Sequence, residues 1–156
     1  MSGDLLWDNV AFLCGFESAA GTDDYIDESE YAHPITSFFN APNADTSVFK
    51  FGTSSAYFDG VNYVLQTPND PAFDFGDEDF TIEAWIRKPG STVLGDVICS
   101  LWRNGTGQQS WLFGIDTSDE LYFAYSTDGS DSFVLSEPMP GYSDNFWYHV
   151  AVARHG

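Results

Sequence analysis

The sequence is short of basic residues, and this shortage excludes one large class of partners. Of 156 residues only 5 are lysine or arginine, against 24 aspartates and glutamates, so the formal net charge is -19. Contacts to phosphates depend on lysine and arginine, and we therefore expect no nucleic-acid partner. A calcium ion, a cationic partner surface or a high-salt habitat suits this charge better, and solubility alone would also account for it.

Long apolar runs and paired cysteines are also missing. No stretch approaches the roughly 20 apolar residues of a membrane-spanning helix, so we expect no membrane insertion. Residues 1–8 have neither the basic region nor the apolar core of a secretion signal. The only cysteines, Cys14 and Cys99, lie in apolar runs outside any CxxC or Cys/His cluster. We expect buried free thiols rather than a disulfide or a zinc site.

Aromatic residues, in contrast, are abundant, with 14 Phe, 8 Tyr and 5 Trp. Residues 80–87 alternate apolar and polar positions, which indicates a strand with one face in a core. Other short apolar stretches are separated by turn residues and have no helical period; they cover 9–17, 35–39, 96–102, 111–115, 121–125, 132–135 and 147–154. The sequence predicts an all-β fold, a two-sheet antiparallel sandwich formed by a single domain over 1–156.

Alternation along these stretches also predicts which side chains form the core between the two sheets. These are Phe58, Phe80, Ile82, Ala84, Ile86, Leu112, Val150 and Val152.

A second motif lies upstream of the 80–87 strand. Ala56-Tyr57-Phe58 is followed by Asp59-Gly60 and then by Tyr63-Val64-Leu65, which predicts a hairpin. The FDG sequence followed by FTIEAW resembles the laminin-G-like (concanavalin A-like, pentraxin-like) jelly-roll family. The resemblance extends over roughly 51–156. Residues 7–10, before the stretch 9–17, resemble the opening of laminin-G-like proteins from tailed phages.

This resemblance implies a jelly roll with at least one more strand after 147–154. The sequence is therefore expected to lack the last strands of the fold. An open sheet edge at 147–154 would leave backbone groups unpaired, so we expect a partner to cover it. That partner is further chain, another copy, or a different virion protein. The charge favours a basic or apolar partner surface, or calcium between subunits.

Catalytic motifs are missing. Many glycosidases on this sandwich carry closely spaced carboxylates in an ExDxE pattern, and no such pattern is present here. There is also no GxSxG, HExxH or Walker-type loop. We therefore predict a protein without catalytic residues that is not an enzyme.

An acidic loop is the candidate metal site. Asp23, Asp24, Asp27 and Glu28 lie within the loop expected over 18–34, and their hard oxygen ligands suit calcium. The family resemblance implies the same ion, since such sandwiches often bind calcium at one rim through acids of an early loop. Ca²⁺ is thus the one cofactor we expect, and a solvated loop without an ion is the alternative.

Aromatic side chains are the candidate glycan-binding residues, because the C–H faces of sugars stack on flat rings. Trp85 shares the polar face of its predicted strand with Glu83, and three more aromatic residues lie at or near strand ends or turns: Trp102, Trp111 and Tyr142. A two-sheet core also uses large aromatic side chains, so packing is the alternative role for each.

Two functions compete. The first is a non-enzymatic virion structural or accessory protein of a tailed phage, in a tail fibre, tail-associated position or capsid decoration. It would be assembled in the host cytoplasm, and would contact other virion proteins or copies of itself and a host-surface glycan. The resemblance to phage proteins and the lack of a secretion signal favour it. The alternative is a carbohydrate-binding module of a larger bacterial surface protein or glycosidase.

Overall fold

The computed structural model describes residues 7–90, 95–103 and 107–156. The backbone forms two compact units, residues 1–73 and 74–156. The first unit contains the 3-10 helices η1 (Trp7–Asn9) and η2 (Pro71–Phe73) and four short strands: β1 (Thr36–Ser37), β2 (Asn43–Asp45), β3 (Ser55–Tyr57) and β4 (Leu65–Gln66). The second contains β5 (Phe80–Arg87), β6 (Asp96–Arg103), β7 (Gln108–Ile115), β8 (Glu120–Tyr125), β9 (Phe133–Pro138) and β10 (Trp147–Arg154).

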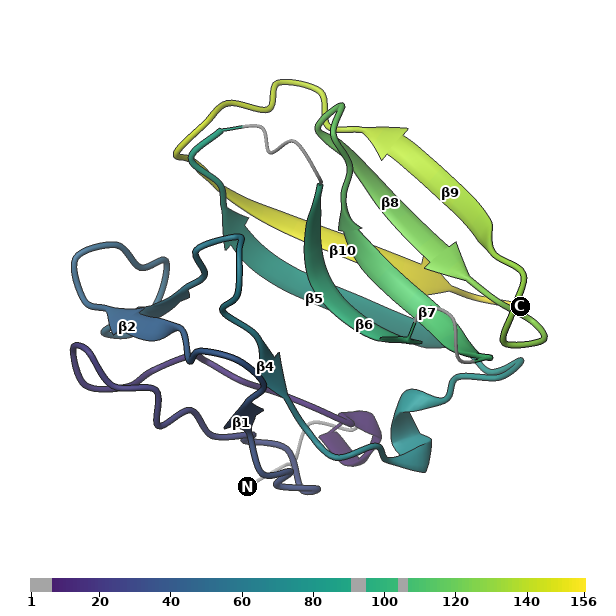
Figure 1. Ribbon diagram of the computed structural model, residues 1–156, viewed down its shortest axis with the longest axis horizontal. Coiled ribbons are helices and arrows are strands. Elements are labelled where there is room, and N and C mark those ends of the chain that lie inside the picture. The colour runs from purple at the N-terminus through teal and green to yellow at the C-terminus, as the bar shows by residue number, and fades with distance from the viewer. Residues whose placement is uncertain (1–6, 91–94, 104–106) are drawn as a thin grey trace. The chain divides into compact units, whose positions relative to one another are not determined.

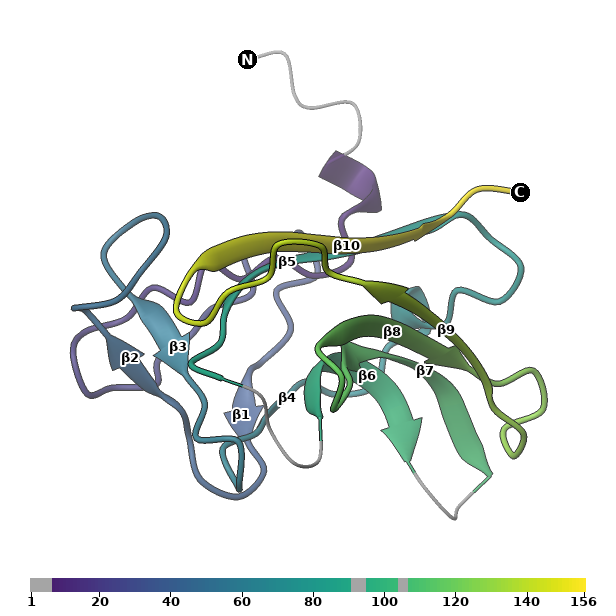
Figure 2. The same ribbon diagram turned by 90° about the horizontal axis from the view of Figure 1, so that it is seen from above.

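The second unit is a sandwich of two antiparallel layers (Figure 1). One layer is a four-stranded sheet in the order β6-β7-β8-β9, and the other is the pair of β5 and β10. Figure 2 shows this pair lying across the four-stranded sheet. β5 and β10 pair along their whole length, from Trp147 opposite Arg87 to Arg154 opposite Phe80. The prediction of an all-β fold with antiparallel sheets is confirmed.

The core of this sandwich follows the predicted alternation of β5. Six of the predicted core residues pack in or against the buried cluster: Phe80, Ile82, Ala84, Ile86, Val150 and Val152. The prediction for Leu112 is wrong, because its neighbours Trp111 and Phe113 point into the core instead. Successive side chains of a strand point to opposite faces, so Leu112 lies on the other face of β7.

The predicted hairpin over 56–65 is wrong. β3 pairs with β2, and β4 pairs with β1. Oδ1 of Asp59 accepts hydrogen bonds from the backbone N–H groups of residues 61, 62 and 63, at 2.9, 3.0 and 3.1 Å. The chain therefore makes a wider, side-chain-closed turn. Phe58 is 44% exposed and packs edge-on against Phe16 within the first unit. Its predicted position in the core between the two sheets is therefore also wrong.

The predicted strand over 9–17 is also wrong. After η1 this segment has no regular secondary structure. The N–H groups of Leu13 and Gly15 donate to the carboxylates of Asp27 and Glu28, and in the described part of the chain only the Leu13 carbonyl accepts a bond from the backbone of this loop, that of Glu28, so no regular strand ladder forms here. Phe16 adopts a φ of 53°, in the left-handed region, which interrupts an extended run.

Many acidic side chains close turns in the same way. Asp45, Asp59, Asp70, Asp116 and Asp128 each accept a hydrogen bond from the backbone N–H of a nearby later residue. Such bonds favour the ionised carboxylate, and they lower the pKa of Asp59 and of Asp128. Some of the many acidic side chains therefore stabilise turns of the backbone through hydrogen bonds.

Both cysteines are free thiols, as predicted, and each is partly buried. Cys99 packs against the core of the second unit, where burial raises the pKa of its thiol to about 12. The thiolate is the reactive form, so Cys99 is protected from reaction at neutral pH.

Helices are few in the part of the chain that the structure describes. None of the helices there has the length and apolar character needed to cross a membrane.

Candidate functional site

The outer face of β5 and β10 carries an exposed indole next to a carboxylate and an imidazole. Trp85 is 41% exposed, since it lies on the face of β5 that points away from the core. His149 lies opposite Trp85 in the strand register, and their ring centroids are 5.2 Å apart. Nε2 of His149 lies 3.2 Å from Oε2 of Glu83. These three residues form what we call the outer-face site.

Each member of the outer-face site can reach a ligand in solvent. The side chains of His149 and Glu83 are 45% and 62% exposed. The indole of Trp85 offers an apolar plane, the Glu83 carboxylate accepts hydrogen bonds, and the His149 imidazole can donate or accept. An apolar plane bordered by hydrogen-bonding groups suits a ligand that has both C–H faces and hydroxyl groups.

The other aromatic candidates lie outside the outer-face site. Trp111 is only 9% exposed and stacks on Phe75 at 5.1 Å in the core, so we correct its predicted binding role to core packing. Trp102 is half-buried near the end of β6, in the four-stranded sheet. Tyr142 is half-buried between β9 and β10, with its ring 5.2 Å from that of Tyr148. Glycan contacts of Trp102 and Tyr142 stay predictions.

In the acidic loop, Asp27 is engaged by its own surroundings. Its side chain is fully buried and accepts hydrogen bonds from the N–H groups of Leu13 and Ser29, both at 3.0 Å. The backbone N–H and Nδ1 of His33 approach it to 2.9 and 2.7 Å. Burial by itself raises the pKa of this carboxyl, but the hydrogen bonds outweigh burial and hold the pKa well below its usual range. A metal ion at Asp27 would have to displace these donors.

The other acids of the loop are more accessible. Asp23 and Asp24 are exposed, and Oε1 of Glu28 accepts a hydrogen bond from Gly15 N at 3.1 Å. Among the described residues, no group of three or more His, Cys, Asp and Glu side chains is placed to hold a metal ion. Calcium binding stays a prediction, with Asp23, Asp24 and Glu28 as the acids most able to supply ligands.

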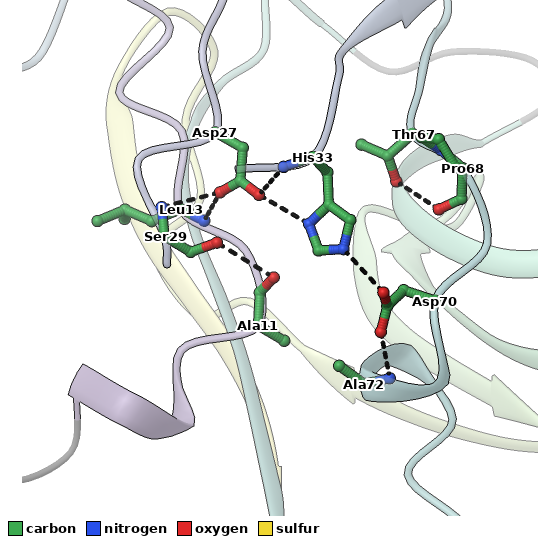
Figure 3. A network of polar contacts seen from close by, with 9 residues as sticks. All are labelled: Ala11, Leu13, Asp27, Ser29, His33, Thr67, Pro68, Asp70 and Ala72. Carbon is green, nitrogen blue, oxygen red and sulfur yellow. Dashed lines mark hydrogen bonds and ion pairs between the residues drawn. The ribbon is translucent and has the colours of Figure 1, made fainter. Parts of the chain in front are cut away.

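Sequence analysis did not single out His33, yet it is the centre of a buried polar bridge (Figure 3). Besides its contact with Asp27, its Nε2 lies 3.4 Å from Oδ2 of Asp70. The imidazole stacks on Tyr31 and packs against Phe73, with centroids 5.4 and 4.9 Å apart. We call Asp27, His33 and Asp70 the His33 bridge; it joins separate loops of the first unit. Asp27 and His33 are buried, so the bridge has a structural role.

Comparisons with known proteins agree with this architecture. Residues 58–156 match the family model described as "Concanavalin A-like lectin/glucanases superfamily". A crystal structure of the binding domain of Paraclostridial Mosquitocidal Protein 1 is similar, with a TM-score of 0.70 and 18% identity. The similarity covers 96% of this chain but 37% of that one, and at this identity it shows the fold alone. No curated protein matches the sequence. Because the family model covers more than half of the chain, the protein belongs to the concanavalin A-like lectin/glucanases superfamily.

Proposed function

We propose that this chain is a carbohydrate-binding domain, and that saccharides bind at the outer-face site. The observation that carries the proposal is the half-exposed indole of Trp85 beside the contact between Glu83 and His149. Membership of a superfamily that includes lectins supports the same class of ligand.

The physical basis is the combination of a flat ring with fixed polar groups. Sugar C–H faces stack on the indole, while sugar hydroxyls exchange hydrogen bonds with the carboxylate and the imidazole. All three side chains project from paired strands, and residues on regular elements hold their geometry better than residues on loops. Binding therefore needs little reorganisation of the protein.

Replacing Trp85 by alanine is expected to weaken glycan binding by about tenfold or more, because stacking is lost at the centre of the site. A glycan array identifies the ligand, and isothermal titration of both proteins with that ligand measures the change. Glu83→Gln keeps the shape of the side chain and removes its charge, so it is expected to have a smaller effect in the same direction.

Phe133→Ala is the matched control, since this ring is 50% exposed but lies on β9 of the other sheet. Phe133→Ala should bind the glycan like the wild type. Wild-type affinity in Trp85→Ala would contradict the proposal. Circular dichroism of each variant checks that the fold is kept.

A second proposal is the virion role, as an accessory protein of a tailed phage that contacts other virion proteins or its own copies. It is supported by the resemblance of residues 7–10 to the opening of phage proteins of this fold. Electron microscopy of particles with an antibody against this chain tests it. Labelled tails or capsids support a virion role, whereas labelled bacterial surfaces support a module of a larger surface protein or glycosidase.

Calcium binding at the acidic loop is a third proposal, supported by the exposed carboxylates of Asp23 and Asp24. An ion bound only by the folded state raises the melting temperature, by about 5–10 °C when calcium is roughly 100-fold above its dissociation constant. Melting curves with calcium and with a chelator measure the shift, and Asp23→Asn/Asp24→Asn should abolish it. Identical curves in calcium and chelator would support the solvated loop.

A further inference from the structure

β9 is an exposed edge strand with apolar side chains. All six of its residues are exposed, and Phe133, Val134 and Leu135 are 50%, 60% and 62% exposed. β9 pairs with β8 on one side and ends the sheet order, so in the described part of the chain no strand pairs with its other side. Backbone donors and acceptors on that side can pair with an added strand.

The inner face of the sheet is uncovered at this edge. Leu135 lies opposite Phe123 in the register, and Phe133 lies opposite Tyr125. Directly opposed side chains share one face of the sheet, and Phe123 is buried in the core. Leu135 and Phe133 are therefore on the core-facing side and yet stay largely exposed. The rings of Phe123, Tyr125 and Phe133 form a continuous stack from the core to the edge.

The segment that contains β9 is acidic. Between Arg103 and Arg154 the sequence contains no lysine or arginine, and seven acidic residues: Asp116, Asp119, Glu120, Asp128, Asp131, Glu137 and Asp144. Of these, Glu137 lies in β9 and Asp131 just before it. Lys88, which directly follows β5, pairs with Asp119 at 2.8 Å and with Asp96 at 3.1 Å, and so offsets part of the acidic charge beside the start of β8. An acidic edge repels a second copy of this acidic chain and attracts a basic partner.

We propose that the free edge of β9 is a docking surface for an extended basic segment of a partner protein. The segment pairs with β9 as an additional strand of the sheet, a known mode of peptide recognition. On the core-facing side of the added strand, apolar side chains cover Phe133 and Leu135, and a lysine or arginine two positions beyond them on the same side faces Glu137, which shares this face with Leu135. A further basic residue at the other end of the segment faces Asp131. The docking surface and the outer-face site lie on different sheets, so the two proposals stand independently.

The test uses the full ¹⁵N-labelled chain and a short synthetic peptide, Lys-Thr-Val-Thr-Val-Thr-Lys, whose valines and lysines share one face of an extended strand. The peptide is expected to shift the backbone amide signals of β8 and β9 in NMR spectra. The double variant Asp131→Lys/Glu137→Lys should weaken its binding by about tenfold, and raised salt should weaken binding to the wild type. Phe133→Ala/Leu135→Ala should weaken it as well, through the lost apolar cover.

Val97→Ala and Glu30→Lys are the matched controls. Val97 is 57% exposed on β6, at the opposite edge of the same sheet, and Glu30 is an exposed acid of the first unit. Both should bind the peptide like the wild type. Equal binding of the peptide in which glutamate replaces both lysines would overturn the proposal, as would amide shifts that spare β9. Sedimentation of the free chain as a dimer that Leu135→Lys dissociates would assign the edge to a second copy instead, and would also overturn it.

Discussion

Replacing Asp27 by alanine is expected to lower the free energy of unfolding by about 3–5 kcal/mol. The carboxylate is buried, and its removal leaves the N–H groups of Leu13, Ser29 and His33 without their acceptor. Each buried donor that loses its partner costs roughly 1–3 kcal/mol. Breaking a buried pair with an imidazole has a cost of the same order. Urea unfolding of the variant and the wild type measures the difference.

Asp24→Ala is the control for this substitution, because Asp24 is an exposed acid in the same loop. Its effect should stay within about 0.5 kcal/mol. A double-mutant cycle with His33→Ala should give a coupling energy, since the two side chains are in direct contact. A loss below ~1 kcal/mol in Asp27→Ala would show that the His33 bridge does not hold the first unit together.

Stability should also depend on pH through Asp27. The pKa of this carboxyl is lower in the folded protein than the ordinary value of 3.8. A depressed pKa means that the stabilisation is fully present above about pH 4 and is lost as the pH falls through the folded-state value. The free energy of unfolding of Asp27→Asn should therefore fall less steeply below pH 4 than that of the wild type. Parallel pH profiles of the two proteins would contradict this assignment.

Replacing Phe113 by alanine is the second substitution with a large expected effect, a loss of about 3–5 kcal/mol. Phe113 is 1% exposed and lies in the core with Trp111, Phe123 and Val150, so its loss leaves a cavity between the two layers of the sandwich. Typical domains are stable by only ~5–15 kcal/mol, and the variant is therefore expected to be partly unfolded at moderate temperature. Calorimetry and urea unfolding measure the change.

Phe133→Ala again provides the comparison, because it removes the same side chain from an exposed position in the same sheet. Its effect on unfolding should stay within about 0.5 kcal/mol. Equal losses in the two variants would mean that the core does not lie between β7 and β10. Together, the two substitutions separate the energetic contribution of a buried phenylalanine from that of an exposed one.

The sequence by itself determined the strands of the second unit. Alternation in 80–87 and turn residues between the later apolar stretches are local properties, and β5 and β10 begin and end at the predicted residues. Glu83 and Trp85 could be placed together on an outer face for the same reason, since residues two apart on a strand point the same way. In β7 the pattern did not show which side chains face the core, because every position from Trp111 to Phe113 is apolar. Packing against the opposite layer decided which of them are buried.

In the first unit, contacts between segments distant in the sequence determined the backbone structure. The run over 9–17 has the pattern of a strand, yet the partners of its N–H groups at Leu13 and Gly15 are the carboxylates of Asp27 and Glu28, and hydrophobic patterns do not report such bonds. Asp59 likewise closes a turn that separates two expected hairpin strands. The contact of His149 with Glu83 exists only because β10 pairs with β5 in one register. Local pattern thus determines which segments extend, whereas long-range pairing determines which side chains meet, because contacts between distant segments leave no periodic signal in the chain.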